Sequence, residues 1–348
     1  MAFLSKLTGL FNSGQAFIEG SPFYALSASV AKGRNKSIKI IKPIAFENNI
    51  FRDSAYLDGS ILKTLSSYKK AIYHVQPTSQ FIYRTKLEPK VKNQGIRGLS
   101  VLIKERFNVD LVQNKVAVLS ADTGIEVNEK TKEIPENICI VGAQKSELKN
   151  IQEEMMRARV FLQKLYFTSL AIPFGLGDYN RTFNLKKPIM VIDFSMQRSC
   201  VYVIGGDKIL AAYPPTHGFK NLLSLARKEC NLPDDISTYR FITSEISPNH
   251  EAVSQLLQRM ISDIKSYIDF FEVQAGDTID SLFFVGLPDK MSWLREALSK
   301  ALEIAPLKLD YKNWFEKRKI SFDSDASLKK LSNDSWFGMI SAILQDVN

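Results

Sequence analysis

Two short turns carry small or polar residues directly after apolar, strand-like stretches. The first is Gly20-Ser21-Pro22, and the second is Asp193-Phe194-Ser195. Backbone N–H groups in such turns can cradle a phosphate, and a glycine lets the backbone approach it closely. A carboxylate such as that of Asp193 can hold a hydrated magnesium ion. The two turns are therefore candidates for binding the phosphates of a nucleotide.

Ordinary structural roles compete with this chemistry. Asp193 can cap its own turn at a strand end, while Ser21 and Ser199 can be common turn and strand serines. Arg198 could bind phosphate directly, although a single arginine on a turn is usually a surface residue. No Ser/His/Asp or Cys/His arrangement can be assembled, and the three histidines are too scattered for a metal motif. The structural role is favoured for the serines, and both roles stay open for Asp193.

Apolar periodicity predicts the elements that would position these turns. In the first half, residues 23–30 and 38–46 continue a meander, a helix begins near residue 58, and residues 72–75 form a strand. In the second half, His217-Gly218 is expected to open a helix. The other expected elements there are strands at 189–192, 199–204, 209–213 and 282–285, and helices at 251–274, 291–302 and 334–344.

Between the two halves, the order strand, helix, strand, strand describes a small α+β insertion at residues 77–144. A stripe of apolar residues from Leu148 to Leu165, at helical spacing, then predicts one long helix that starts at Ser146. At the N-terminus, apolar residues share one helical face in the segment 1–14, and docking on the protein or a partner is favoured over membrane contact.

Composition excludes several classes of protein. The 348 residues are 45% apolar and 24% charged, as in globular proteins of about two or three folding units. The net charge of +9 is spread over the sequence and favours a solvated surface, with an anionic membrane or acidic partner as the alternative. Nucleic acid ranks last because no aromatic platform accompanies the basic residues. No apolar run reaches the roughly 20 residues of a membrane helix, so a cytosolic protein is expected.

The two halves repeat one order of strand, small-residue turn, hairpin and helices, near residue 15 and again near residue 188. This layout resembles the superfamily that holds actin, hexokinase and the heat-shock chaperones. More narrowly, it resembles the type IV pilus assembly protein PilM and its relative FtsA, over about Gln15 to Leu344. The strongest local match is the stretch 259–288, RMISDIKSYIDFFEVQAGDTIDSLFFVGLP.

The resemblance assigns nucleotide-cleft positions to residues of both turns, of the His217-Gly218 helix start and of a later loop: Gly20, Ser21, Asp193, Ser195, Ser199, Gly218 and Gly286. The pattern departs from the family, because Ser195 stands for a glycine and Pro288 lacks a backbone donor. Losing several hydrogen bonds of about 0.5–3 kcal/mol each would abolish useful affinity. A degenerate nucleotide cleft is therefore expected.

The resemblance implies a two-lobed α/β actin-like ATPase fold with a small α+β insertion domain in the first lobe. The N-terminal amphipathic segment spans residues 1–14. The other domains are then a first lobe at 15–76 and 145–186, the insertion at 77–144, and a second lobe at 187–348 with a helical subdomain at about 214–278.

The resemblance also implies a cytosolic scaffold at the inner face of the cytoplasmic membrane, in a type IV pilus or related secretion platform. Such a protein binds the cytosolic tail of a PilN-like membrane protein and links it to a motor ATPase. No catalytic residue, metal or cofactor is expected. The alternative is an ATPase or kinase of the same superfamily that binds ATP and Mg²⁺, and a third reading is the cytoplasmic domain of a type II secretion protein.

Overall fold

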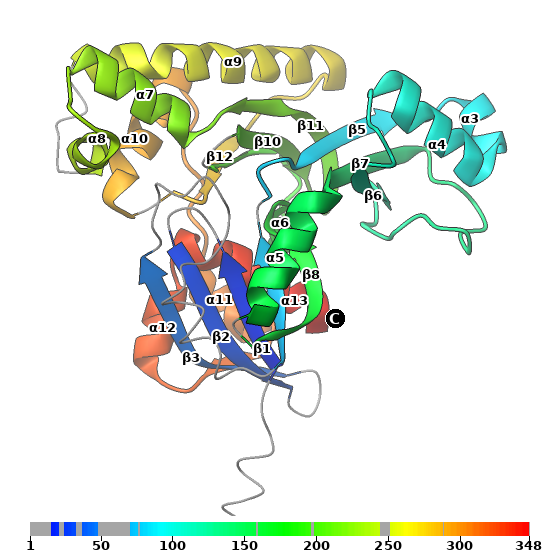
Figure 1. The fold of residues 1–348 in the computed structure, drawn as a ribbon, viewed down its shortest axis with the longest axis horizontal. Coiled ribbons are helices and arrows are strands. Elements are labelled where there is room, and N and C mark those ends of the chain that lie inside the picture. Colours follow the sequence, from blue (N-terminus) through cyan, green and yellow to red (C-terminus); the bar gives the residue numbers. More distant parts are fainter. Residues whose placement is uncertain are drawn as a thin grey trace, which may run out of the picture. The chain divides into compact units, whose positions relative to one another are not determined.

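The computed structural model in Figure 1 describes residues 15–20, 24–32, 37–47, 70–75, 77–157, 159–195, 198–243, 251–287 and 289–347. The chain folds as two compact units, each made of segments that are separate in the sequence. The first unit comprises Met1–Gln76, Gln152–Gly175 and Leu309–Asn348, and the second comprises Pro77–Ile151 and Leu176–Lys308. The N-terminal segment 1–14 and the helix predicted near residue 58 lie outside the described residues.

A six-stranded sheet in the order β13-β3-β2-β1-β4-β8 forms the first unit. Its antiparallel meander, β1 (Gln15–Gly20), β2 (Tyr24–Lys32) and β3 (Ile38–Glu47), and the strand β4 (Lys70–Val75) confirm the predicted strands. Three further pairs are parallel: β4 with β1, β8 (Phe161–Phe167) with β4, and β13 (Ile320–Phe322) with β3.

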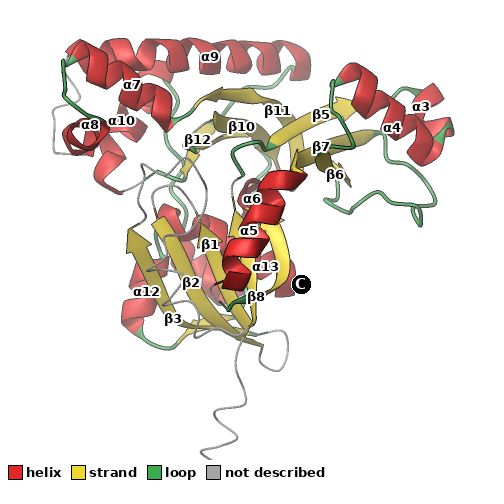
Figure 2. Cartoon of the chain, in the orientation of Figure 1, coloured by secondary structure: helices red, strands yellow, loops and turns green. Residues whose placement is uncertain are grey.

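Three C-terminal helices contact strands of this sheet. They are α11 (Tyr311–Lys317), α12 (Asp325–Leu331) and α13 (Phe337–Val347), with the short 3-10 turn η3 (Asp334–Trp336) before the last. Figure 2 shows two of them, α12 and α13, against the strands of the sheet. Helix α13 contacts β1 and β2, and its Phe337 ring lies 5.8 Å from that of buried Trp314. Burial of these large apolar side chains provides the main driving force for docking the helices on the sheet.

The C-terminal segment belongs to the first unit, although the sequence analysis placed all of 187–348 in the second lobe. The reason is strand pairing: Ile320 of β13 stands opposite Ile38 of β3, and the Ile38 N–H donates to the Lys319 carbonyl at 3.1 Å. Helices α11, α12 and α13 flank this strand and therefore complete the first sheet instead of the second.

The long helix predicted from Ser146 to Leu165 is wrong in its second half. Helix α5 (Lys145–Arg157) ends early, and β8 begins at Phe161. Arg159 adopts a left-handed φ of +60°, its N–H donates to the Met156 carbonyl (2.8 Å), and the Val160 N–H donates to the Met155 carbonyl (2.9 Å). This pair of hydrogen bonds is a Schellman C-cap, which stops the helix and releases the chain to pair with β4.

The second unit contains a four-stranded sheet in the order β11-β10-β9-β12. Strands β9 (Ile189–Asp193), β10 (Arg198–Gly205) and β11 (Lys208–His217) are antiparallel neighbours, and β12 (Ser281–Val285) pairs with β9 in parallel. All residues of β9 and β12 are buried, which explains their continuous apolar runs. The four strands confirm the predictions for this half.

Helices α7 (Phe219–Glu229) and α9 (Glu251–Ala275) pack on one another and on β11, as Figure 1 shows. With α8 (Asp235–Thr243) they occupy the range 214–278, where the helical subdomain is predicted. Helix α10 (Ser292–Leu302) packs on α9 and follows the 3-10 turn η2 (Asp289–Met291). Helix α6 (Thr168–Phe183) and α5 each cross a boundary between the two units.

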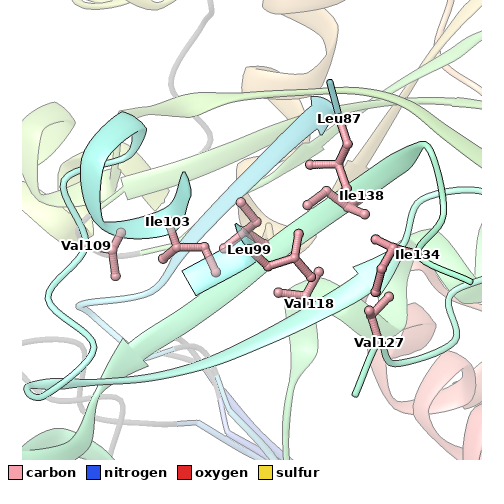
Figure 3. Packing of buried hydrophobic residues seen from close by; sticks show 9 residues of the cluster. Leu87, Leu99, Ile103, Val109, Val118, Val127, Ile134 and Ile138 are labelled. Atoms are coloured by element: carbon pink, nitrogen blue, oxygen red, sulfur yellow. The ribbon is translucent and has the colours of Figure 1, made fainter. Parts of the chain in front are cut away.

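The predicted insertion at 77–144 forms a three-stranded antiparallel sheet in the order β5-β7-β6. Its elements are β5 (Phe81–Lys86), α3 (Pro89–Asn93), α4 (Gly95–Arg106), β6 (Asn114–Ser120) and β7 (Asn137–Gln144). Leu99 and Ile103 of α4 pack on Val118 and Ile138 of the sheet (Figure 3). In the sequence the insertion interrupts the first unit, but in the structure it belongs to the second unit. For example, Arg84 Nε donates a hydrogen bond to the Ile209 carbonyl on β11 at 2.8 Å.

Candidate functional site

The turn after β9 begins at Asp193, whose side chain is 1% exposed. Asp193 stands opposite Cys200 on one side and Val285 on the other, so neighbouring strands fix the end of β9 on both sides. The next residue, Phe194, donates its N–H to the Val285 carbonyl at 2.9 Å. This backbone amide is therefore already used inside the protein.

Gly286, directly after β12, approaches this turn closely. Its φ of +79° favours glycine, and a Cβ at this position would overlap the carbonyl oxygen of Phe194. The tight packing of these two turns explains why a glycine stands at this position. Pro288, two residues after Gly286, lies outside the described residues.

Gly218 is the N-cap of α7 and has an extended backbone, with φ −87° and ψ −177°. The following residue, Phe219, donates its N–H to the carbonyl of Ser195 at 2.9 Å. A free helix N-terminus attracts anions through its unpaired amides. The first amide of α7 instead ties the helix to the turn after β9.

Ser199 lies on β10, beside the same turn, and is fully buried. Its hydroxyl has no hydrogen-bond partner among the residues that the structure describes. The side chain of Arg198, a candidate phosphate ligand in the sequence, lies outside the described part of the chain.

Gly20 ends β1 in the first unit, where a Cβ would overlap the hydroxyl of Tyr73 on β4. Before it, the side chain of Glu19 is 2% exposed and points at the first turn of α13. A Cβ on Gly338 would lie 2.5 Å from Glu19 Oε1 and 3.0 Å from Oε2, so only glycine fits between the carboxylate and the helix. A carboxylate is stabilised at a helix N-terminus by the helix dipole.

The sequence-predicted residues thus fall into two groups. Asp193, Ser195, Gly218 and Gly286 come together in the second unit, with Ser199 on the adjoining strand. Gly20 lies in the first unit, and Ser21 lies outside the described residues. The sequence analysis missed the contact between Glu19 and Gly338, and the available signal was an acidic residue inside an otherwise apolar strand.

Two buried cysteines lie among the described residues. Burial raises the pKa of the Cys139 and Cys200 thiols to about 12, so neither is a thiolate at neutral pH. Among the described residues, no three His, Cys, Asp or Glu side chains are grouped so that they could hold a metal ion. No helix in the described ranges is both long and apolar enough to cross a bilayer.

No protein-family model matches the chain, and no curated protein matches it either. Among solved structures, a chain of the "PilM-PilN type IV pilus biogenesis complex" aligns with a TM-score of 0.72 and 11% identity, over 97% of this chain and 99% of that chain. A Bacteroides thetaiotaomicron protein with an actin-like ATPase fold and unknown function aligns with a TM-score of 0.47 and 11% identity, over 97% of both chains.

The cytoplasmic domain of EpsL, an inner-membrane component of the Vibrio cholerae type II secretion system, aligns with a TM-score of only 0.35 and 12% identity. The alignment covers 57% of this chain and 70% of the EpsL chain. The chain of the pilus biogenesis complex aligns over nearly the full length of both chains and therefore shows the fold of this chain. The chain has the actin-like ATPase fold, and the resemblance to PilM that its sequence indicates is confirmed for that fold.

Proposed function

We propose that the protein is a scaffold of a type IV pilus or related secretion platform, peripheral to the inner face of the cytoplasmic membrane. In this proposal it binds the cytosolic tail of a PilN-like membrane protein and connects it to a motor ATPase. The observation that carries the proposal is the alignment with a chain of the PilM–PilN complex over 97% of this chain, with a TM-score of 0.72.

We further propose that the remnant nucleotide site does not turn over ATP and that the protein is not an enzyme. Two backbone contacts support this. The Phe194 amide is bonded to the Val285 carbonyl, and the Phe219 amide to the Ser195 carbonyl, both at 2.9 Å. These amides cannot bind phosphate without breaking internal hydrogen bonds, each with a net worth of about 0.5–1.5 kcal/mol.

The test of the scaffold is isothermal titration of the full chain with a synthetic peptide that copies the cytosolic tail of the PilN-like protein from the same source. We expect saturable binding with one peptide per chain, and none with a peptide of scrambled order. Absence of binding up to about 1 mM, which corresponds to −4.1 kcal/mol, would overturn the proposed partner.

A second titration, with ATP and Mg²⁺, tests the nucleotide site separately. We expect no saturable heat up to millimolar concentrations. Tight, magnesium-dependent binding would instead establish the alternative, an ATP-binding member of the actin and hexokinase superfamily, and would leave the result with the tail peptide unaffected.

A further inference from the structure

A pocket of about 290 Å³ lies between α7 and α9 in the second unit. Its apolar lining comes from Leu222 and Leu225 of α7 and from Met260 of α9. Leu222 is 4% exposed and Met260 is 1% exposed, so the apolar surface lies at the base of the pocket and not on a protruding ridge. None of these residues belongs to the turns described above.

Two cations border the same pocket. Lys228 near the end of α7 and Arg259 on α9 both line it and are both exposed. Neither has an ion pair with any side chain that the structure describes, although Asp263 follows Arg259 by one helical turn. Exposed Ser224 adds a hydroxyl at the pocket. An apolar base with positive charge at its border complements a ligand that carries an apolar group beside carboxylates.

The shape argues against an anionic membrane as the occupant. Membrane recognition by electrostatics uses clusters of about four to eight basic residues, and interfacial helices insert protruding apolar side chains. The described lining of this pocket offers two cations and a recessed apolar base, which a flat bilayer surface does not reach.

The pocket is also small for a nucleotide. Sites for small molecules and cofactors typically measure about 300–1,000 Å³, and this one is at their lower limit. The described residues that line it include no aromatic ring on which a base could stack. A volume of this size suits one large apolar side chain, as in helix-groove recognition of peptides.

We propose that the pocket between α7 and α9 docks an acidic peptide segment of a protein partner. One apolar side chain of the segment enters between Leu222, Leu225 and Met260, and neighbouring carboxylates pair with Lys228 and Arg259. This site is independent of the proposed binding of a PilN-like tail, and it does not require that the chain act in pilus assembly.

The test begins with a display library of random twelve-residue peptides, selected on the immobilised full chain. We expect enrichment of peptides in which Asp or Glu lies within four residues of Leu, Ile, Met or Phe. The most enriched peptide is then labelled with fluorescein, and its affinity is measured by anisotropy.

Two variants and one matched control locate the binding site. Arg259→Glu reverses the charge at the pocket and Ser224→Trp fills it without changing charge, and each should weaken binding by about tenfold or more. Lys265→Glu makes the same charge change on the same helix, away from the pocket, and should alter affinity by no more than about twofold. All three positions are exposed, so the fold should tolerate these changes.

Three results would overturn the proposal. The first is a selection without an acidic and apolar consensus. The second is equal weakening by Arg259→Glu and Lys265→Glu, which would indicate only the overall charge. The third is that the unaltered chain binds no peptide but binds vesicles of phosphatidylcholine with phosphatidylglycerol, and that Arg259→Glu loses this vesicle binding while Lys265→Glu keeps it. That result would make the site a lipid-contacting surface.

Discussion

His74 lies on β4, inside the six-stranded sheet, with a fully buried side chain. Neither ring nitrogen has a hydrogen-bond partner among the described residues, and the ring lies 5.2 Å from that of Tyr166 on β8. Burial disfavours the charged imidazolium and lowers the pKa of His74 to about 3. The folded protein therefore keeps this histidine neutral.

This histidine should make the stability of the protein depend on pH. In the unfolded chain the His74 pKa returns to about 6.5, so the unfolded state binds more protons below that pH. Above about pH 6.5, His74 does not reduce the free energy of unfolding. Between pH 6.5 and pH 5 its titration lowers the free energy of unfolding by about 2 kcal/mol, and the loss continues until the pH reaches the pKa of the folded state. In urea unfolding at pH 7.5, 6 and 5, His74→Leu should show a shallower pH dependence. Equal slopes for both proteins would contradict this account.

Gly286 permits a matched comparison of strain and steric overlap. Gly276 also has a positive φ, +63°, but an added Cβ would meet nothing within 4 Å. Gly276→Ala should therefore cost only the left-handed backbone penalty of about 1–2 kcal/mol. Gly286→Ala should cost a further 1–3 kcal/mol or so, because its Cβ meets the Phe194 carbonyl. Denaturant unfolding of the two variants measures the difference, and equal losses would show that the turn can relax.

Helix α5 is tied at its start to the entry of the inserted sheet through Glu147. One carboxylate oxygen of Glu147 accepts from the Thr78 N–H at 2.6 Å and its hydroxyl at 2.9 Å, and the other accepts from the Ser79 N–H at 3.0 Å. The Gln144 N–H in turn donates to the Ser79 hydroxyl at 2.9 Å. The entry and exit of the insertion are thereby held together.

Removing this carboxylate should loosen both ends of the insertion. Hydrogen bonds to charged groups are worth about 1.5–3 kcal/mol, so Glu147→Ala should lose roughly 2–4 kcal/mol of stability. The Thr78 and Ser79 amides should exchange faster with deuterium. Glu153→Ala on the same helix removes a partly exposed ion pair with Arg157 at 3.9 Å, and pairs at this helical spacing are worth about 0.3–0.5 kcal/mol, so it should cost less than Glu147→Ala. Unchanged exchange in Glu147→Ala would refute the clamp.

Elements with strong local signals could be predicted from the sequence. Strands β9 and β12 each contain a run of four apolar residues between turns, and Gly205-Gly206 marks the hairpin between β10 and β11. The end of α5 could not, because an arginine at position 159 takes the left-handed conformation that usually favours glycine. Leu162 and Leu165 continue the helical spacing by coincidence, and pairing with β4 decides their conformation.

At the scale of the whole molecule, the turn after β9 and the start of α7 could be located from the sequence, but whether their backbone amides are free or hydrogen-bonded could not. That state depends on Phe194 meeting Val285 and on Ser195 meeting Phe219, which are contacts between distant parts of the chain. The placement of residues 309–348 has the same origin. It depends on a three-residue strand, Ile320–Phe322, pairing with β3 far earlier in the sequence.

Deleting Leu309–Asn348 should therefore affect the two units differently. The second unit keeps its last backbone contact, because the Leu307 N–H donates to the Leu282 carbonyl at 2.7 Å. The first unit loses β13 and the buried face of α13. In hydrogen exchange, a chain that ends at Lys308 should lose protection in β1, β2 and β3 and keep it in β9 and β12. Protected amides in β1 to β3 would show that the sheet forms without its C-terminal partners.

The late position of β13 and α13 also has a consequence for biosynthesis. A ribosome makes β1, β2 and β3 long before it makes β13 and α13, which complete and cover this sheet. Pairing across such a separation is slow, because a long loop must close before its contacts are gained. The nascent strands β1 to β3 therefore expose apolar surface until β13 and α13 have been made, and a chaperone that covers them during this interval would prevent aggregation.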